Sequence, residues 1–253
     1  MFHVATSNPI GRTTTVKVRD LAIPVRLVLI ADIHVAGPDM PPRRVGRIVE
    51  EINAQQPDIV LIAGDFVSDK KLSTHQYAVR DAIAPLAGLK AQLGVIAVIG
   101  NHDHWRDAGS VRAELKRVRI RVLDNDAVRV GPITVGGVDD PFTGHDNLGL
   151  TLDRMRSMPG PRILLTHSPD IFPQVPPDLP LTLAGHTHCG QIRLPFIGAL
   201  STMSRYGERY ACGRVDEGGR TLIVSAGLGT SLLPLRLGAA PDFWVIDLRP
   251  SNR

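Results

Sequence analysis

The sequence predicts an α/β fold, and two observations carry that prediction. Short apolar runs rich in Val, Ile and Leu alternate along the chain with longer segments of helical spacing. Most of the short runs are apolar throughout, as strands covered on both faces are. The 253 residues are 43% hydrophobic, which is enough to bury one large core or two modest ones. No linker rich in Pro and Ser divides the chain, so we expect a single domain over residues 1–253.

The expected elements follow one another in a regular order. Apolar runs predict strands at residues 26–31, 58–63, 95–99, 162–165, 181–184, 221–225 and 243–248. Helical spacing predicts helices over residues 42–56, 74–92 and 110–118. Residues 128–138 are typical of a hairpin with Gly131 and Pro132 at its turn. The segment 189–220 is predicted to be a long excursion between strands, and loops of that length are usually functional or disordered.

Composition excludes several classes of protein. Charged residues make up 21% of the chain, and the 24 Gly and 20 Pro show no repeat, which excludes disordered, collagen-like and coiled-coil sequences. The apolar stretch 21–31 is interrupted by Pro24 and Arg26 and is shorter than the roughly 20 residues of a membrane helix. Residues 1–20 do not resemble a signal peptide. We expect a cytoplasmic protein that makes at most peripheral contact with a membrane.

Charge and cysteine content say less about partners. Lys and Arg exceed Asp and Glu by 29 to 25, a mild excess that does not indicate stable nucleic-acid binding. Cys189 and Cys212 are the only cysteines, and we expect both to be free thiols in a reducing compartment.

Five of the predicted strands end in a short polar cluster. The clusters are Asp32-Ile33-His34, Gly64-Asp65, Gly100-Asn101-His102-Asp103, Thr166-His167 and Gly185-His186-Thr187-His188. Because ligands of open α/β sheets bind outside the carboxyl ends of the strands, five separate segments can converge on one site. Six of the nine histidines lie in or directly beside these clusters, whereas His3, His75 and His145 have no such context and are expected at the surface.

The donor types in these clusters suit metal ions. Carboxylates, imidazole nitrogens and an Asn carbonyl favour Mn, Fe or Zn, and no thiolate is needed. Residues two apart in an extended segment project to the same side, so Asp32 and His34 can hold one ion together, as can His186 and His188. One carboxylate can bridge two ions, which in two-metal hydrolases generate hydroxide and neutralise charge on a phosphoryl group.

In this order the five clusters resemble the motifs of the calcineurin-like metallophosphoesterases. The resemblance spans about residues 27–188, and as a set the motifs are highly specific. Segments 185–198, 227–236 and 241–248 further resemble the bacterial phosphodiesterases that include a UDP-diacylglucosamine pyrophosphatase. The resemblance implies two mixed β-sheets packed together and flanked by helices, in four layers.

The resemblance also implies roles for individual residues. Asp32, His34, Asp65 and His188 would hold one divalent ion, and Asp65, Asn101, His167 and His186 would hold the other, with Asp65 bridging. His102 would face the substrate, as general acid to the leaving oxygen or as a stabiliser of phosphoryl charge. The implied activity is hydrolysis of phosphodiester or pyrophosphate bonds in a small or amphiphilic substrate, with metal-activated hydroxide as nucleophile.

The sequence departs from its relatives at three places. The N-terminal membrane helix that the narrower subfamily often carries is not found here, which weakens the transfer of a lipid substrate. Cys189 stands where glycine is usual. In the phosphoprotein-phosphatase branch an Asp three residues after the bridging Asp orients the catalytic His, and here that position is Ser68. Either Asp69 or Asp103 can take its place, so a serine/threonine protein phosphatase is disfavoured.

Other assignments stay open on sequence alone. A nuclease on the same metal site is disfavoured by an aromatic content of 4%, and a non-catalytic scaffold by the retention of every ligand and of His102. His104 and Trp105 suit packing as well as substrate contact. Guanidinium groups suit phosphate, so Arg205, Arg209 and Arg236 are candidate substrate ligands. The excursion mixes apolar residues with arginines, which fits a substrate with an anionic head and an apolar or sugar portion, or a loop with a small core of its own.

Overall fold

The central strands of this chain are apolar on both faces, and each face packs against a different layer. In β2, Val25–Ile30, the side chains of Leu27 and Leu29 belong to the core between two sheets. Val28 and Ile30 point the opposite way and pack under helices. This alternation with a period of two residues places β2 between a sheet and a helical layer. The computed structural model describes residues 1–251.

The first sheet is mixed and has six strands in the order β1-β16-β2-β4-β6-β7. Its members beside β2 are β1 (Ile10–Val18), β4 (Ile59–Ala63), β6 (Val95–Val98), β7 (Arg121–Val122) and β16 (Asp242–Pro250). Strands β2, β4, β6 and β7 run parallel. β16 is antiparallel to β2 and parallel to β1, so the last strand of the described chain lies between two of the earliest.

The second sheet is also mixed and has the order β14-β15-β11-β10-β9-β8. Its strands are β8 (Asp126–Val130), β9 (Ile133–Val138), β10 (Arg162–Thr166), β11 (Leu181–Ala184), β14 (Gly213–Glu217) and β15 (Arg220–Val224). The four inner strands are parallel, and the two edge strands are antiparallel to their neighbours. Leu165, Leu183 and Ile223 of this sheet share a core with Leu27 and Leu29 of the first, so the sheets pack face to face.

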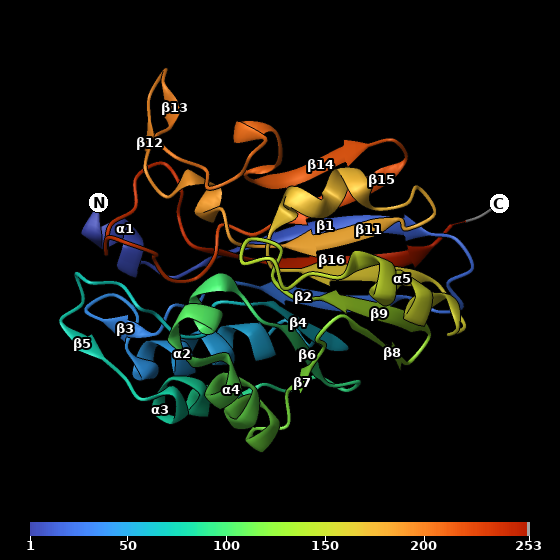
Figure 1. Cartoon of the computed structure of the whole chain (residues 1–253), viewed down its shortest axis with the longest axis horizontal. Helices are drawn as coiled ribbons and strands as arrows, with labels where there is room; N and C mark the ends of the chain where they lie inside the picture. The colour runs from blue at the N-terminus through green and yellow to red at the C-terminus, as the bar shows by residue number, and fades with distance from the viewer. Residues whose placement is uncertain (252–253) are drawn as a thin grey trace.

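Helices cover the outer faces, which completes the four predicted layers (Figure 1). On the first sheet lie α2 (Pro42–Asn53), α3 (Val79–Ile83), the 3₁₀ turn η1 (Ala84–Gly88) and α4 (Asn101–Arg117). On the second lie α5 (Leu148–Arg156) and η2 (Pro169–Gln174), through Met155 and Phe172. Short pieces complete the chain: α1 (Phe2–Thr6), β3 (Ala36–Gly37), β5 (His75–Gln76), η3 (His188–Gly190), β12 (Arg193–Leu194), β13 (Gly198–Ala199) and η4 (Gly207–Tyr210).

The predicted strands and the hairpin are confirmed to within two residues at each end, but two predicted helices have different bounds. The helix expected over 74–92 is reduced to α3 and η1, because His75–Gln76 pairs with β3 and Pro85 falls where the helix would continue. The helix expected over 110–118 begins at Asn101, so part of a predicted loop motif is its first turn.

The prediction of free thiols is wrong, because Cys189 and Cys212 form a disulfide. The excursion folds back on itself, so that the Thr187 hydroxyl donates to the Ala211 carbonyl oxygen at 2.6 Å. The Cα atoms of Cys189 and Cys212 therefore lie only 4.6 Å apart. A count of two cysteines cannot show this proximity. The argument for a reducing compartment therefore loses its basis.

Within residues 1–251, no helix combines the length and apolar character that crossing a membrane requires. α4, with 17 residues, is the longest helix of that range, and it carries several charged residues.

Candidate metal centre

The five polar clusters meet at the carboxyl ends of β2, β4, β6, β10 and β11. Backbone hydrogen bonds join the loops after β2 and β4: Asp32 donates to the Gly64 carbonyl and His34 to the Asp65 carbonyl, each at 3.0 Å. Asp32, His34 and Asp65 all have positive φ, which turns the chain sharply so that successive side chains face one point. Every predicted ligand side chain is buried there.

The first group of predicted ligands is assembled as expected. The Nε2 atoms of His34 and His188 lie 3.1 Å apart, and Asp32 Oδ1 lies 3.6 Å from Nε2 of His188. Asp65 Oδ2 lies 3.4 Å from Nε2 of His34. Four donor atoms from three strand ends therefore surround one point.

The second group shares an atom with the first. Asp65 Oδ2, already beside His34, also lies 3.2 Å from Nε2 of His167. Asn101 Oδ1 lies 2.9 Å from both His167 Nε2 and His186 Nδ1. The Asp65 carboxylate thus stands between two sets of donors, the position that a bridging ligand needs.

Hydrogen bonds to backbone carbonyls show that this second group presents lone pairs. A carbonyl oxygen only accepts, so His167 Nδ1 donates to Ala63 at 2.6 Å and His186 Nε2 donates to Met203 at 3.1 Å. When these rings are neutral, His167 Nε2 and His186 Nδ1 are unprotonated; His167 Nε2 faces the Asn101 and Asp65 oxygens, and His186 Nδ1 faces the Asn101 oxygen. Acceptors this close together, with no donor between them, fit a bound cation. Histidines that bind a metal usually donate their other ring N–H to a backbone carbonyl or a carboxylate, as these two do.

Burial keeps most of the imidazoles neutral and ready to bind. It lowers the pKa of His34 and of His188, and it lowers that of His186 to about 4. Burial also raises the pKa of Asp32 to about 7. His167 is the exception, because the adjacent Asp65 carboxylate raises its pKa well above the ordinary value although burial opposes this. Burial also opposes ionisation of Asp65, but the neighbouring histidines, His167 first, outweigh it and hold the pKa of Asp65 well below its ordinary value.

His102 lies beside these donors and is held at both ring nitrogens. Its Nδ1 is paired with the Asp69 carboxylate, and its Nε2 lies 3.3 Å from the Ser231 hydroxyl oxygen. Its backbone N–H donates to Asp65 Oδ1 at 2.9 Å. Of the two candidates for the orienting carboxylate, Asp69 occupies the position. Asp103 instead accepts from the backbone N–H groups of Gly100, Asp65, Phe66 and Val67, so it joins the start of α4 to the loop after β4.

Comparison with known proteins agrees with this geometry. Residues 25–190 match the family described as "Calcineurin-like phosphoesterase". The chain belongs to this family. An "Uncharacterized metallophosphoesterase" of Helicobacter pylori is 30% identical, over all of this chain and 67% of its own. "Uncharacterized metallophosphoesterase YkuE" of Bacillus subtilis is 32% identical over 81% of this chain and 72% of its own. "Phosphodiesterase YaeI" of Escherichia coli is 30% identical over 91% and 84%.

A buried ion pair sits behind His102 in this phosphoesterase. Lys70 Nζ donates to Asp39 Oδ1 at 2.5 Å and to Thr230 Oγ1 at 3.1 Å, and Thr230 donates to Asp39 Oδ2 at 2.7 Å. Lys70 adjoins Asp69 in the chain, and Thr230 adjoins Ser231. The network therefore joins the two loops that supply the neighbours of His102.

The three arginines predicted to bind substrate contact other parts of the chain. Arg236 is fully buried and donates to the carbonyls of Ala226, Gly227, Gly229 and Ala239, and its Nη2 lies 3.3 Å from Nδ1 of His188, so it supports a loop and one predicted metal ligand. Arg205 is exposed and lies 3.5 Å from Asp170. Arg209 is exposed and pairs with Glu217 at 2.7 Å. None of the three lines the cavity beside the metal centre.

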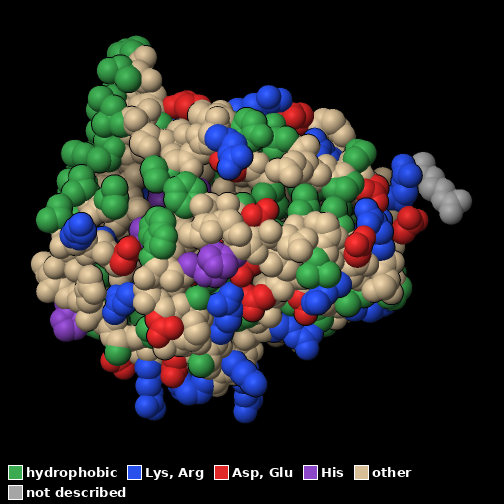
Figure 2. All heavy atoms as spheres, in the orientation of Figure 1, with side chains coloured by type: hydrophobic (Ala, Val, Ile, Leu, Met, Phe, Trp, Pro, Cys, Tyr) green, Lys and Arg blue, Asp and Glu red, His purple; other side chains and the backbone are tan. Residues whose placement is uncertain are grey.

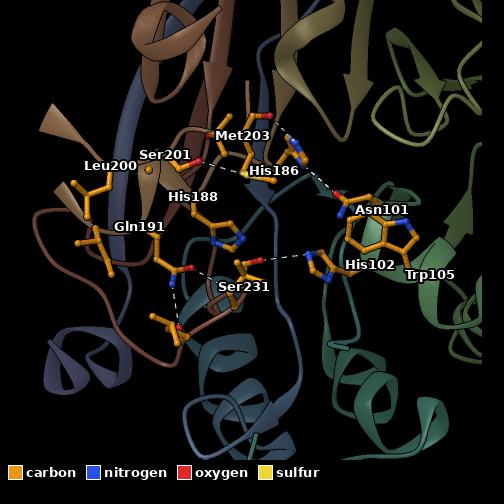
Figure 3. Close-up of a pocket in the computed structure, with 15 residues that line it drawn as sticks. Asn101, His102, Trp105, His186, His188, Gln191, Leu200, Ser201, Met203 and Ser231 are labelled. Atoms are coloured by element: carbon orange, nitrogen blue, oxygen red, sulfur yellow. Dashed lines mark hydrogen bonds between the residues drawn. The ribbon is translucent and has the colours of Figure 1, made fainter. Parts of the chain in front are cut away.

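A cavity of ≈ 280 Å³ opens beside His102, His186 and His188 (Figure 3). Trp105 forms part of its wall and contacts His102 edge to face at 4.9 Å between ring centroids. Of the two roles that the sequence left open for Trp105, packing or substrate contact, its position suits substrate contact. His104 packs instead, bonded to Asp139 at 2.8 Å and stacked on His145.

Sequence reasoning missed the far wall of this cavity. Gln191, Ser231, Leu232 and Leu233 line it, from the loops that follow β11 and β15. β15 was predicted as a strand, and the Ser225-Ala226-Gly227 segment at its carboxyl end is a sixth polar strand end. That segment was the available signal for the loop that carries Ser231.

Proposed function

We propose that this phosphoesterase is a two-metal hydrolase of phosphodiester or pyrophosphate bonds. The observation that carries the proposal is the position of Asp65 Oδ2, within 3.4 Å of a nitrogen from each donor group. Asp32, His34, Asp65 and His188 would hold one ion, and Asp65, Asn101, His167 and His186 the other. The donor types favour Mn, Fe or Zn.

The bound ions supply a water nucleophile at neutral pH and offset phosphoryl charge. Asn101 and Asp65 would hold the ions at their positions, because both side chains reach His167 from the ends of the neighbouring strands β6 and β4. In the overall reaction, water adds across a phosphorus–oxygen bond, and the leaving oxygen takes a proton. His102 is the group placed to give that proton: its Nδ1 is engaged by Asp69, and its Nε2 faces the cavity.

The cavity disfavours the nuclease alternative. No Lys or Arg is among the residues that line it, whereas grooves for single strands carry positive charge along the nucleic-acid backbone. The scaffold alternative is disfavoured because every donor and His102 are present and converge.

Asp65→Asn tests the two-metal arrangement most sharply. The wild-type chain should bind two divalent ions when its metal content is measured by mass spectrometry after reconstitution. Asp65→Asn removes the shared charge, so it should lose both ions and hydrolysis of bis-p-nitrophenyl phosphate. His34→Ala should chiefly weaken one site.

Asp153→Asn, an exposed residue of α5, is the matched control and should keep both metals. Full metal content and activity in Asp65→Asn would overturn the arrangement. A screen of the wild type on cyclic nucleotides, nucleotide-sugar pyrophosphates and single-stranded DNA would separate a hydrolase of small substrates from a nuclease.

A further inference from the structure

Beyond its histidines, the cavity beside the metal centre is lined by apolar side chains and by the uncharged polar residues Asn101, Thr187, Gln191, Ser201 and Ser231. The apolar part of its wall is made of Trp105, Ile192, Leu200, Met203, Leu232 and Leu233, and no Lys, Arg, Asp or Glu lines it. A phosphoryl group at the metal centre therefore has an apolar space next to it. Because this space offers no cation to a second phosphate and much of its wall is apolar, it suits a hydrocarbon portion of the substrate.

The apolar wall continues outward onto a projecting hairpin. β12 and β13 form this hairpin, and residues 194–200 read Leu-Pro-Phe-Ile-Gly-Ala-Leu, with no polar side chain. Phe196 at the tip is fully exposed and Ile197 is 71% exposed. Leu200 belongs to both the hairpin base and the cavity wall. Figure 1 shows the hairpin standing out from the rest of the chain, and Figure 2 shows apolar side chains along this projection.

The shape and charge of the hairpin favour a lipid bilayer as its occupant. The three residues on each side of Phe196 in the segment Arg193–Ala199, at about 3.3 Å each, give a reach of about 10 Å, comparable with the depth of the headgroup and upper acyl region. Arg205 and Arg209 are exposed in the same excursion, each beside one carboxylate, and their exposed guanidinium groups can also meet anionic headgroups. A protein partner would cover the apolar tip but would give no reason for its continuity with the cavity.

We propose that the hairpin Arg193–Ala199 inserts into a lipid bilayer and that the cavity receives the hydrocarbon portion of a phosphate ester drawn from it. The second half of this proposal rests on the hydrolase function proposed above. The first half does not, because insertion needs neither metals nor catalysis.

Vesicle flotation tests insertion directly. The wild-type chain, with and without metals, is mixed with vesicles of phosphatidylcholine alone or with phosphatidylglycerol added. We expect binding to both, stronger to the anionic vesicles. Phe196→Ser/Ile197→Ser should weaken binding at least about tenfold, since two side chains lose their transfer into the membrane. Ile23→Ser, which changes an equally exposed residue in the turn between β1 and β2, should bind as the wild type does.

A pair of chromogenic diesters tests the cavity. Dodecyl p-nitrophenyl phosphate and bis-p-nitrophenyl phosphate both release p-nitrophenol on hydrolysis, but only the first carries a long chain. The wild type should have a lower KM for the dodecyl ester. Leu232→Ser should raise that KM about tenfold more than it raises the KM for the aromatic diester.

Several outcomes would overturn the proposal. Absence of vesicle binding, or equal binding by the tip variant and the wild type, would reject insertion. A dimer that is seen in light scattering and lost in the tip variant would assign the hairpin to a second copy of the chain. Equal KM changes on both diesters would reject the hydrocarbon site. If the metal-loaded wild type hydrolyses neither diester yet floats with vesicles, the hydrolase function fails and insertion stands.

Discussion

At the scale of single residues, the surroundings of His102 decide which chemistry it can do. The Asp69 carboxylate is paired with Nδ1, and the other nitrogen faces the cavity beside Ser231. A carboxylate in that place holds a proton on Nδ1, so the ring exchanges protons with the substrate through Nε2.

His102→Ala should lower turnover by about 10²–10⁴ while the metals stay bound, because it removes a positioned acid. The loss should be smallest for p-nitrophenol esters, whose leaving group scarcely needs a proton, and largest for alkyl leaving groups. Steady-state rates across a leaving-group series, with metal content measured on the same samples, check this. A loss of equal size across the series would instead make His102 a stabiliser of phosphoryl charge.

The identity of the orienting carboxylate could not be predicted from sequence. Asp69 and Asp103 both lie near a metal-ligand motif, and the choice depends on where each side chain points. Asp103 lies in the first turn of α4, so its carboxylate meets the free N–H groups at the start of the helix and in the loop beside it. Asp69 lies in the loop after β4 and reaches His102 from across the site.

At the scale of elements, the excursion after His188 is closed at its base by the Cys189–Cys212 disulfide. The hairpin formed by β12 and β13 lies within this closed loop, together with Met203, whose carbonyl accepts from His186. The covalent closure therefore holds both the projecting hairpin and one support of the metal centre.

Replacing both cysteines with Ala should lower the free energy of unfolding by about 3 kcal/mol, as expected when a loop of this size is no longer closed in the unfolded chain. Urea unfolding with and without dithiothreitol measures this loss. The reductant should shift the wild type and leave the double variant where it is. Two thiols per native chain in a titration with Ellman's reagent would contradict the disulfide.

The strand ends were predictable and the start of α4 was not. Apolar runs identify strands by composition, so the clusters after them could be placed at one sheet edge from sequence alone. Asn101, His102 and Asp103 form a polar motif at a strand end, which resembles a loop until Gly100 is recognised as the residue before a helix. At this site, metal ligation and helix initiation use the same residues.

At the scale of the whole molecule, charge pairs join strands that are distant in sequence. Arg26 of β2 donates to both carboxylate oxygens of Asp247 of β16, at 2.9 and 3.3 Å. The hydrogen bond from Arg26 is the largest cause that lowers the pKa of Asp247. A carboxyl group with a lowered folded-state pKa stabilises the fold above its unfolded pKa of about 4, and that contribution is lost as the pH falls.

Asp247→Asn should therefore cost about 0.5–1 kcal/mol of stability near pH 7, and the cost should shrink as the pH falls below about 4. Unfolding by urea at several pH values measures the difference. The control is Asp153→Asn, which breaks the more exposed pair with Arg156 within α5 and should cost less. If the loss of unfolding free energy in Asp247→Asn did not change with pH, the loss would come from packing and not from the ion pair.

The edge strand β1 was missed because it has little apolar content. Its sequence, Ile-Gly-Arg-Thr-Thr-Thr-Val-Lys-Val, is exposed along most of its length, and it pairs with β16 alone. Such a strand is defined by its neighbour, which lies more than 230 residues away in the chain.

The place of β16 between β1 and β2 has a consequence for synthesis. The edge of β2 that β16 covers has no partner until residues 242–250 have been made, although β2 itself ends at Ile30. At about 5–20 residues per second, a ribosome takes about 10–40 s to cover that interval. An unpaired, apolar strand edge is a template for pairing with other chains. The nascent chain therefore carries an unpaired apolar strand edge until β16 has been made and has paired with β2.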